Sequence, residues 1–206
     1  MPAIDHVVYG VPDLDEAAGD LERRLGVRPG PGGRHVGAGT HNALLGLGGA
    51  TYLEVIALDP DRAAGARPSF GLETLTEPRL VGWAMRADDL DALVARSREA
   101  GFDPGDIHPL SRTRPDGVRL DWRLTRAGAG HPGFTVPFLI DWMQAEHPST
   151  TSPAGVTLTS FRVLHPDPAP IQAALDALGA GVTVERAPEP ALVATLTGPA
   201  GRVELS

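Results

Sequence analysis

The sequence contains no cysteine. Disulfides, thiolate metal sites and a cysteine nucleophile are therefore excluded, and nothing favours an oxidising compartment. Long apolar runs are also missing, because the longest, such as 42–47, fall far short of the roughly 20 residues that a membrane-spanning helix needs. Residues 1–6 have neither the basic nor the apolar segment of a secretion signal. We therefore expect a cytoplasmic protein with no membrane partner.

Basic residues are too few to balance the acidic ones. With 18 Lys+Arg against 26 Asp+Glu, the formal net charge is -8, which argues against binding of nucleic acid or anionic lipid. The chain also lacks a Walker-type loop, a Gly-x-Gly-x-x-Gly that opens a helix after a strand, a Gly-x-Ser-x-Gly and a His-Glu-x-x-His. Nucleotide cofactors and serine hydrolysis lose support, and the expected partner is a small-molecule substrate.

Apolar segments alternate with Gly- and Pro-rich turns in one recurring order. The β-branched run 4–10 predicts a strand, and Asp13 can cap a helix whose apolar residues recur at spacings of three and four until Gly26. Three strand-like pieces follow, at 27–35, 40–47 and 51–58. The first unit therefore follows a βαβββ plan.

Two further copies of this plan follow along the chain. The second begins with a strand at 80–86 and the third with a strand at 157–164, each followed by a helix that ends at a glycine. Later strands are expected near 102–110, 118–125, 134–142, 182–187, 191–197 and 202–205. A repeat is the economical explanation, with modules at 1–59, 79–143 and 156–206.

The first two modules carry motifs of a known family. These are Asp5-His6-Val7-Val8, Val11-Pro12-Asp13-Leu14, Gly39-Thr40-His41-Asn42-Ala43-Leu44, Tyr52-Leu53-Glu54 and Val136-Pro137-Phe138-Leu139-Ile140-Asp141-Trp142. Over about residues 3–143 the chain resembles the glyoxalase-like domains of the vicinal oxygen chelate superfamily. The resemblance implies paired βαβββ modules that form a cup, with a divalent metal held by His or Glu on the first and last strands of each module. It does not name the reaction, because relatives include isomerases, dioxygenases, thiol transferases and metal-free sequestering proteins.

The predicted fold class is α+β. Modules one and two form a curved, eight-stranded mixed-sheet cup, and the third, βαβββ-like module packs beside it or pairs with another subunit. Because the third module has no partner within the chain, its open sheet edge must be covered, and a homodimer is a natural way to cover it.

Three side chains are candidates for a metal site. His6 occupies the first-strand position at which the family places a metal-binding histidine, and Glu54 and Asp141 occupy the closing-strand positions. The fourth position holds Gly82, which is also what a site looks like after losing its metal. The cofactor is therefore either a divalent ion, with Zn, Fe, Mn, Ni and Mg undecided, or none. The alternative roles are a satisfied strand histidine for His6 and an arginine partner for Asp141.

Two histidines flank a glycine-rich turn and can replace the missing ligand or act as an acid or base near pH 7. His41 is the better candidate, because it lies on the strand that leads to Glu54, whereas His35 precedes the turn. We expect His41 and Glu54 to be the catalytic residues. A solvated histidine at a strand end is the competing interpretation.

Five side chains are candidates for contacts with the substrate. Asn42 offers both a donor and an acceptor, Arg34 can bind a carboxylate or phosphate, and large aromatic side chains supply apolar walls. Each also has a structural interpretation, respectively a turn-stabilising asparagine, a solvated strand arginine and core packing. The predicted substrate-binding set is Asn42, Arg34, Trp83, Phe138 and Trp142.

Two functions follow from these residues. The first is a metal-dependent lyase, isomerase or dioxygenase-like enzyme acting on vicinal oxygens, in which the ion stabilises an enolate-like state. The second is a metal-free protein of the same fold that binds or sequesters a small molecule. The occurrence of His6, Glu54 and Asp141 at three of four equivalent positions favours the enzyme.

Overall fold

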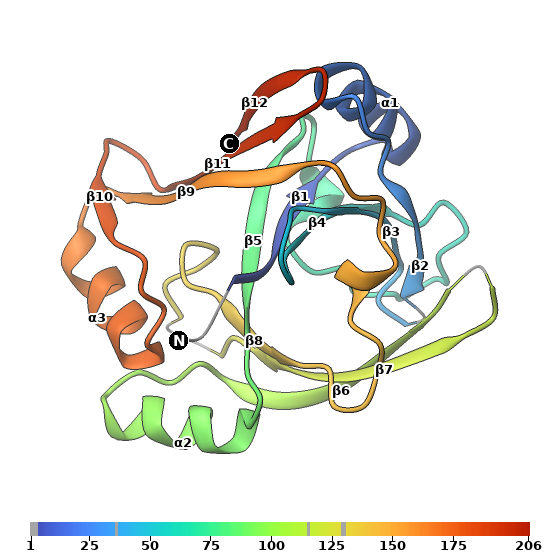
Figure 1. Cartoon of the computed structure of the whole chain (residues 1–206). Coiled ribbons are helices and arrows are strands. Elements are labelled where there is room, and N and C mark those ends of the chain that lie inside the picture. Colours follow the sequence, from blue (N-terminus) through green and yellow to red (C-terminus); the bar gives the residue numbers. More distant parts are fainter. Residues whose placement is uncertain (1–3, 36, 115, 129–130) are drawn as a thin grey trace.

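The computed structural model describes residues 4–35, 37–114, 116–128 and 131–206 (Figure 1). In that part of the chain, three helices and twelve strands repeat the order strand, helix, strand, strand, strand three times. The predicted α+β fold class with βαβββ modules is confirmed. None of the described helices is long and apolar enough to cross a membrane.

The first five elements carry the residues expected to form a site. They are β1 (Ile4–Gly10), α1 (Leu14–Leu25), β2 (Gly30–His35), β3 (Thr40–Gly46) and β4 (Tyr52–Leu58). The side chain of Asp13 accepts a hydrogen bond from the backbone N–H of Glu16, and Gly26 ends the helix at φ 81°. The helix therefore begins and ends at the residues that its sequence predicts.

The next five elements repeat this order. A short 3₁₀ turn, η1 (Leu72–Thr74), precedes β5 (Arg79–Arg86), α2 (Leu90–Glu99), β6 (Asp106–Thr113), β7 (Arg119–Arg126) and β8 (Phe138–Asp141). Strand β6 starts four residues later than the expected 102–110. The reason is local, because Pro104 lacks an N–H and Gly105 has a φ of 96°, so neither fits a regular strand.

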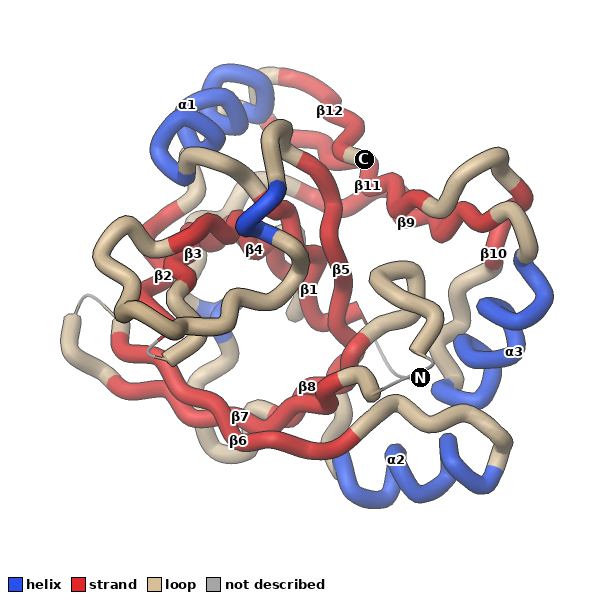
Figure 2. Tube along the Cα trace, turned by 180° about the vertical axis from the view of Figure 1, so that it is seen from behind, coloured by secondary structure: helices blue, strands red, loops and turns tan. Residues whose placement is uncertain are grey.

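These eight strands close into a barrel in the order β1-β4-β3-β2-β6-β7-β8-β5. In each module the first strand runs parallel to the last, and β1 and β5 join the two modules as antiparallel neighbours. The opposite seam is short, since β2 and β6 share one registered pair, Arg34 and Thr113. Figure 2 shows the barrel from behind, with α2 outside β6 and β7.

The last five elements are one helix and the four strands of a separate sheet beside the barrel. They are β9 (Thr157–His165), α3 (Pro168–Leu178), β10 (Val184–Arg186), β11 (Ala191–Gly198) and β12 (Gly201–Leu205), after a 3₁₀ turn η2 (Pro148–Thr150). The strand order is β10-β9-β11-β12, so β9 runs parallel to the second strand of its module and not to the last. Helix α3 packs against α2.

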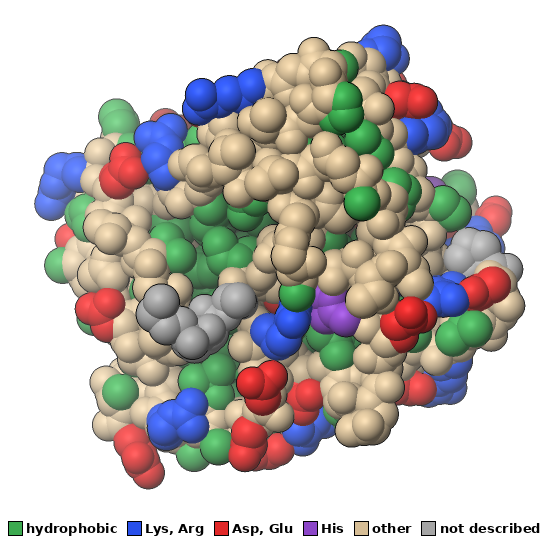
Figure 3. Space-filling view, viewed as in Figure 1, with side chains coloured by type: hydrophobic (Ala, Val, Ile, Leu, Met, Phe, Trp, Pro, Cys, Tyr) green, Lys and Arg blue, Asp and Glu red, His purple; other side chains and the backbone are tan. Residues whose placement is uncertain are grey.

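Backbone hydrogen bonds connect this sheet to the barrel. Leu80 N–H donates to the Ser206 carbonyl and Leu158 N–H to the Leu47 carbonyl, both at 3.1 Å. The largest apolar cluster lies between the outer face of the barrel, the three helices and the four-stranded sheet, where Trp83 packs on Phe161 with ring centroids 5.1 Å apart. On the face drawn in Figure 3, apolar side chains line a hollow beneath β9.

Candidate functional site

The barrel encloses a cavity of about 490 Å³. Its volume lies within the range of small-molecule sites, which is about 300–1,000 Å³. Polar groups come mainly from the strands of the first module, whereas aromatic rings come from both modules. The lining includes His6, His35, Thr40, Asn42, Tyr52, Glu54, Phe70, Arg112, Trp122, Phe138 and Trp142.

A local irregularity of β1 brings Asp5 and His6 together. The register against β5 shifts between Ile4 and His6, so Asp5 is the extra residue of a β-bulge. A bulge turns neighbouring side chains out of strict alternation. As a result, the Asp5 carboxylate lies 2.8 Å from Nδ1 of His6, the adjacent residue.

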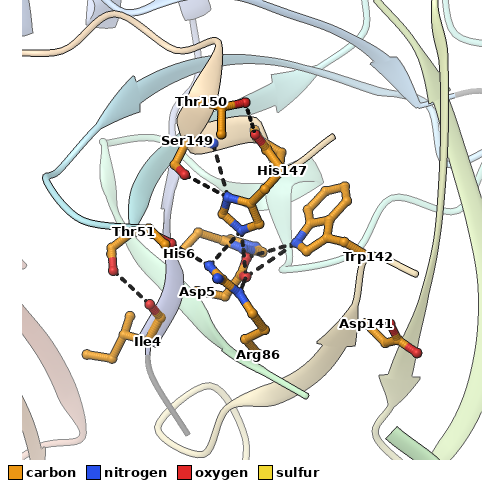
Figure 4. A network of polar contacts seen from close by, with 12 residues as sticks. Ile4, Asp5, His6, Thr51, Arg86, Asp141, Trp142, His147, Ser149 and Thr150 are labelled. Carbon is orange, nitrogen blue, oxygen red and sulfur yellow. Dashed lines mark hydrogen bonds and ion pairs between the residues drawn. The ribbon is translucent and has the colours of Figure 1, made fainter. Parts of the chain in front are cut away.

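Asp5 is the centre of a buried polar network (Figure 4). Its carboxylate is 0% exposed and contacts Nε of Arg86 at 3.0 Å, Nε2 of His147 at 2.9 Å and Nε1 of Trp142 at 3.3 Å. Burial alone raises the pKa of Asp5, but hydrogen bonds from His147 and His6 outweigh it and hold the pKa well below its usual range. The charged carboxylate therefore stabilises a His6 tautomer with the proton on Nδ1 and the Nε2 lone pair free.

Glu54 lies at the other side of His6. Its Oε2 is 3.7 Å from Nε2 of His6, and its Oε1 is 3.8 Å from Nε2 of His35. The Asn42 amide donates a hydrogen bond of 2.6 Å to Oε1. Asp5, His6 and Glu54 thus form a continuous line of carboxylate, imidazole and carboxylate, and the side chain of Glu54 is only 10% exposed.

The ring of His35 is held by two neighbours. Its Nδ1 lies 2.8 Å from Oγ1 of Thr40, and its Nε2 lies 3.4 Å from Nδ2 of Asn42, which can only donate. Burial lowers the pKa of His35, although the charge of Glu54 opposes the shift. The neutral ring with its Nε2 lone pair toward the cavity satisfies both contacts.

Arg112 is a site residue that the sequence reasoning missed. It is 4% exposed, lines the cavity from β6, and donates from Nη1 to the Gly32 carbonyl. Leu110 and Arg112 are two residues apart on β6 and both line the cavity. The period of two along a strand was therefore a signal that could have placed Arg112 on the same face as Leu110. Asp5 was missed because strict alternation turns it away from His6, and His147 because it lies beside a proline in a linker.

Aromatic rings surround the polar groups. The ring of Tyr52 stacks on His6 with centroids 4.7 Å apart, and Phe138 meets the same imidazole edge-on at 5.4 Å. Trp122 lies 6.1 Å from His35 and 5.3 Å from Trp142. This wall suits a ligand with a flat or apolar body.

The structure brings together only part of the predicted set. Asn42, Glu54, Phe138 and Trp142 line the cavity with His6. Trp83 borders the cavity, but its ring packs on Phe161 in the apolar cluster outside the barrel. The expected order of the two histidines is reversed, because Thr40, Asn42 and Leu44 face the cavity, and alternation turns His41 outward while His35 faces Glu54.

Arg34, which was predicted to contact the substrate, lies outside the cavity. Its guanidinium is 54% exposed and pairs with Asp59 at 2.6 Å and Asp61 at 2.5 Å on the surface of the barrel. Arg34 therefore binds carboxylates of its own chain and does not line the cavity.

The residues present do not fit a divalent ion held in the manner of the family. Asp141 does not join His6 and Glu54, since it pairs with Arg123 at 2.7 Å and lies apart from the network in Figure 4. A Cβ added at Gly82 would lie 3.0 Å from the Phe70 ring, so that ring occupies the place of a fourth ligand. Within the described ranges, no cluster of three His, Cys, Asp or Glu side chains could hold a metal. Of the three predicted ligands, only His6 and Glu54 lie close to each other, with Nε2 of His6 3.7 Å from Oε2 of Glu54.

Comparisons with known proteins agree with the barrel. No curated protein matches the chain. A hypothetical protein from Staphylococcus aureus superposes with a TM-score of 0.66 at 13% identity, over 99% of this chain and 85% of that one. Methylmalonyl-CoA epimerase from Mycobacterium tuberculosis gives a TM-score of 0.45 at 22% identity, over 68% and 85% of the two chains.

A second epimerase gives a similar result. The enzyme from Streptomyces coelicolor in complex with 2-nitronate-propionyl-CoA has a TM-score of 0.46 at 22% identity, over 72% of this chain and all of that one. At these values, the epimerases carry no inference about chemistry. A family model described as a glyoxalase-like domain, in contrast, matches residues 4–179, which is most of the chain. The chain belongs to the glyoxalase-like domain family.

Proposed function

We propose that this chain is a small-molecule enzyme that moves a proton at a carbon beside a carbonyl group, in an isomerase- or lyase-type reaction. The observation that carries the proposal is the position of Glu54, whose two carboxylate oxygens face the Nε2 atoms of His6 and His35 at 3.7 and 3.8 Å. A buried carboxylate within reach of two imidazoles has a route by which a proton can arrive and leave.

In the proposed reaction, Glu54 takes the proton of the substrate C–H bond. The electron pair of that bond moves onto the carbonyl oxygen and forms an enolate. Return of a proton to the carbon gives an isomer, and departure of a neighbouring group gives the lyase product, so no electron is gained or lost overall. The proposal is confined to this acid–base chemistry, which needs no oxidant.

His6 is the proposed partner of Glu54 in this transfer. With Nδ1 hydrogen-bonded to Asp5 at 2.8 Å, its Nε2 can accept the proton that Glu54 has taken. The imidazolium so formed is stabilised by the Asp5 carboxylate, as an orienting carboxylate does in a catalytic triad. The distance of 3.7 Å must shorten during the reaction, which is common for sites that tighten around substrate.

Hydrogen–deuterium exchange tests this function without knowledge of the natural substrate. We would follow the α-protons of phenylpyruvate, an anion, and of 2-hydroxyacetophenone, a neutral ketone, by ¹H NMR in D₂O. We expect the protein to accelerate exchange of at least one probe and Glu54→Gln to slow that reaction by about 100-fold or more. Glu146→Gln is the matched control, because Glu146 is exposed and pairs with Arg114. Equal rates in wild type and Glu54→Gln, or no acceleration of either probe, would contradict the proposal.

Elemental analysis of protein purified without chelator tests the metal-free form of the proposal. We expect no stoichiometric divalent ion and exchange rates that EDTA does not change. A stoichiometric ion that is lost in His6→Ala would show instead that His6 is a ligand, and the family's metal chemistry would replace the acid–base route.

A metal-free binding or sequestering protein is the second candidate. It is favoured by the Phe70 ring, which lies where a ligand from the second module would project and extends the aromatic wall. The two functions separate in one comparison: a binding protein holds its ligand equally well in wild type and Glu54→Gln and accelerates no exchange.

Three further expectations stay predictions. They are the division into modules 1–59, 79–143 and 156–206, the cytoplasmic location, and a homodimer that covers the open edges of the four-stranded sheet. Light scattering after gel filtration tests the last, since a monomer at micromolar concentration contradicts it.

A further inference from the structure

We propose that the cavity takes a small organic anion and that Arg112 holds its carboxylate. The inference rests on the proposed function, whose substrate site is the same cavity, and it names the chemical class of the substrate. The ligand is an aromatic or apolar monocarboxylate.

Arg112 carries a charge that its own chain does not neutralise. Only 4% of the residue is exposed, and no described carboxylate lies within 4.0 Å of its guanidinium. Of its five N–H donors, one is used by the Gly32 carbonyl. Arg112 lines the cavity, from which water or a ligand can reach its other donors.

A buried cation without a partner costs free energy. Burial lowers the pKa of Arg112, and the nearby Tyr52 and Glu54 only partly oppose the shift. The other arginine of the lining, Arg126, is exposed, so water solvates its charge. An anion in the cavity would compensate the charge of Arg112, so binding and charge neutralisation are coupled.

The contact with Gly32 does not by itself explain an arginine. A register shift between Pro31 and Gly33 leaves the Gly32 carbonyl outside the ladder of β2 and β3, and one neutral N–H would satisfy it. A guanidinium supplies in addition a planar pair of donors that matches the two oxygens of a carboxylate.

The surroundings define the rest of the ligand. Tyr52, Trp122, Phe138 and Trp142 present rings to the same cavity, and its volume of about 490 Å³ admits one substituted aromatic ring. A carboxylate at Arg112 and an apolar body against these rings together satisfy both parts of the lining.

The experiment compares two probes of the same shape, 3-phenylpropanoate and its neutral amide, 3-phenylpropanamide. Quenching of the cavity tryptophans Trp122 and Trp142 reports binding directly. We expect the acid to bind wild type at least about 10-fold more tightly than the amide, which corresponds to about 1.4 kcal/mol. Arg112→Gln should abolish this preference while keeping a donor for the Gly32 carbonyl.

Arg119→Gln is the matched control, since Arg119 is 67% exposed and pairs with Asp121 at 2.8 Å. It should keep the preference of wild type. Equal affinity of wild type for acid and amide, an unchanged preference in folded Arg112→Gln, or no binding of the acid up to about 10 mM would overturn the proposal. The test also separates the two proposals, because an acid preference that persists in Glu54→Gln supports the anion site even if no proton exchange is found.

Discussion

Replacement of Asp5 by asparagine tests the buried network that positions His6. The carboxylate is 0% exposed and faces four donors, from His6, Arg86, Trp142 and His147. Asparagine keeps the shape but removes the charge and points an N–H₂ group at donors. Breaking a buried charged pair costs about 3–5 kcal/mol, and the 27% exposure of Arg86 places this case near the lower value.

The measurement is urea unfolding of wild type and Asp5→Asn from pH 7 to pH 3. Because the folded-state pKa of Asp5 is lowered, its contribution is fully present above the unfolded pKa of about 3.9 and is lost as pH falls further toward the folded value. We therefore expect a gap of about 3 kcal/mol at pH 7 that begins to narrow only below about pH 4.

Asp121→Asn is the matched control, since Asp121 is 50% exposed in its pair with Arg119 and should change stability by no more than about 0.5 kcal/mol. A gap below about 1 kcal/mol for Asp5→Asn would refute the assignment of Asp5 as the centre of the network. A gap that already closes between pH 7 and pH 5 would refute the lowered pKa.

Three other perturbations test separate parts of the barrel. Gly33→Ala places a Cβ 2.5 Å from a β6 carbonyl oxygen at φ 143°, so it should lower the free energy of unfolding by about 1–3 kcal/mol in urea, whereas Gly128→Ala, with nothing within 4 Å, should not. In an NMR titration, the His35 ring should stay neutral below its ordinary pKa of about 6.5, because burial lowers this pKa in the folded protein. Below that pH the unfolded chain binds more protons than the folded one, so the contribution of His35 to the free energy of unfolding should fall as the pH drops. Gly82→Ala should displace the Phe70 ring, which lies 3.0 Å from the added Cβ. We expect the affinity for 3-phenylpropanoate to change while the melting temperature stays close to that of wild type.

Local patterns predicted the elements of this fold well. Helix α1 begins after Asp13 and ends before Gly26, as its cap residues indicate, and β1 has the bounds of its β-branched run. Strand order could not be predicted from local patterns, because it depends on pairings between segments that are distant in the sequence. The third module has the same order of elements as the first two, yet β9 pairs with β10 and β11. Strand β11 therefore lies between β9 and β12, the first and last strands of the module, which are direct neighbours in the other two modules.

The site was predicted in part for a similar reason. His6 and Glu54 lie on neighbouring strands β1 and β4, and the family motifs were enough to pair them. The choice between His35 and His41 needed the face of each strand, which the bulge in β2 obscures. The period of two along β6 places Arg112 on one face with Leu110, but its burial depends on the closure of β2 on β6, which pairs Arg34 with Thr113 and which no local pattern shows.

The two modules of the barrel have separate tasks. The first supplies the groups proposed to move a proton, His6, His35 and Glu54, and Asn42, which donates a hydrogen bond to Glu54. The second supplies Trp122, Phe138 and Trp142 and, through Arg112, a positive charge. Gly82 and Asp141, the positions at which a symmetric metal site would draw on the second module, are covered by Phe70 and bound to Arg123. Neither position therefore places a metal ligand beside His6 and Glu54. In the two proposals, Arg112 on β6 holds the carboxylate of the substrate while Glu54 on β4 acts as the base, and the anion preference of wild type and Arg112→Gln tests the part of Arg112.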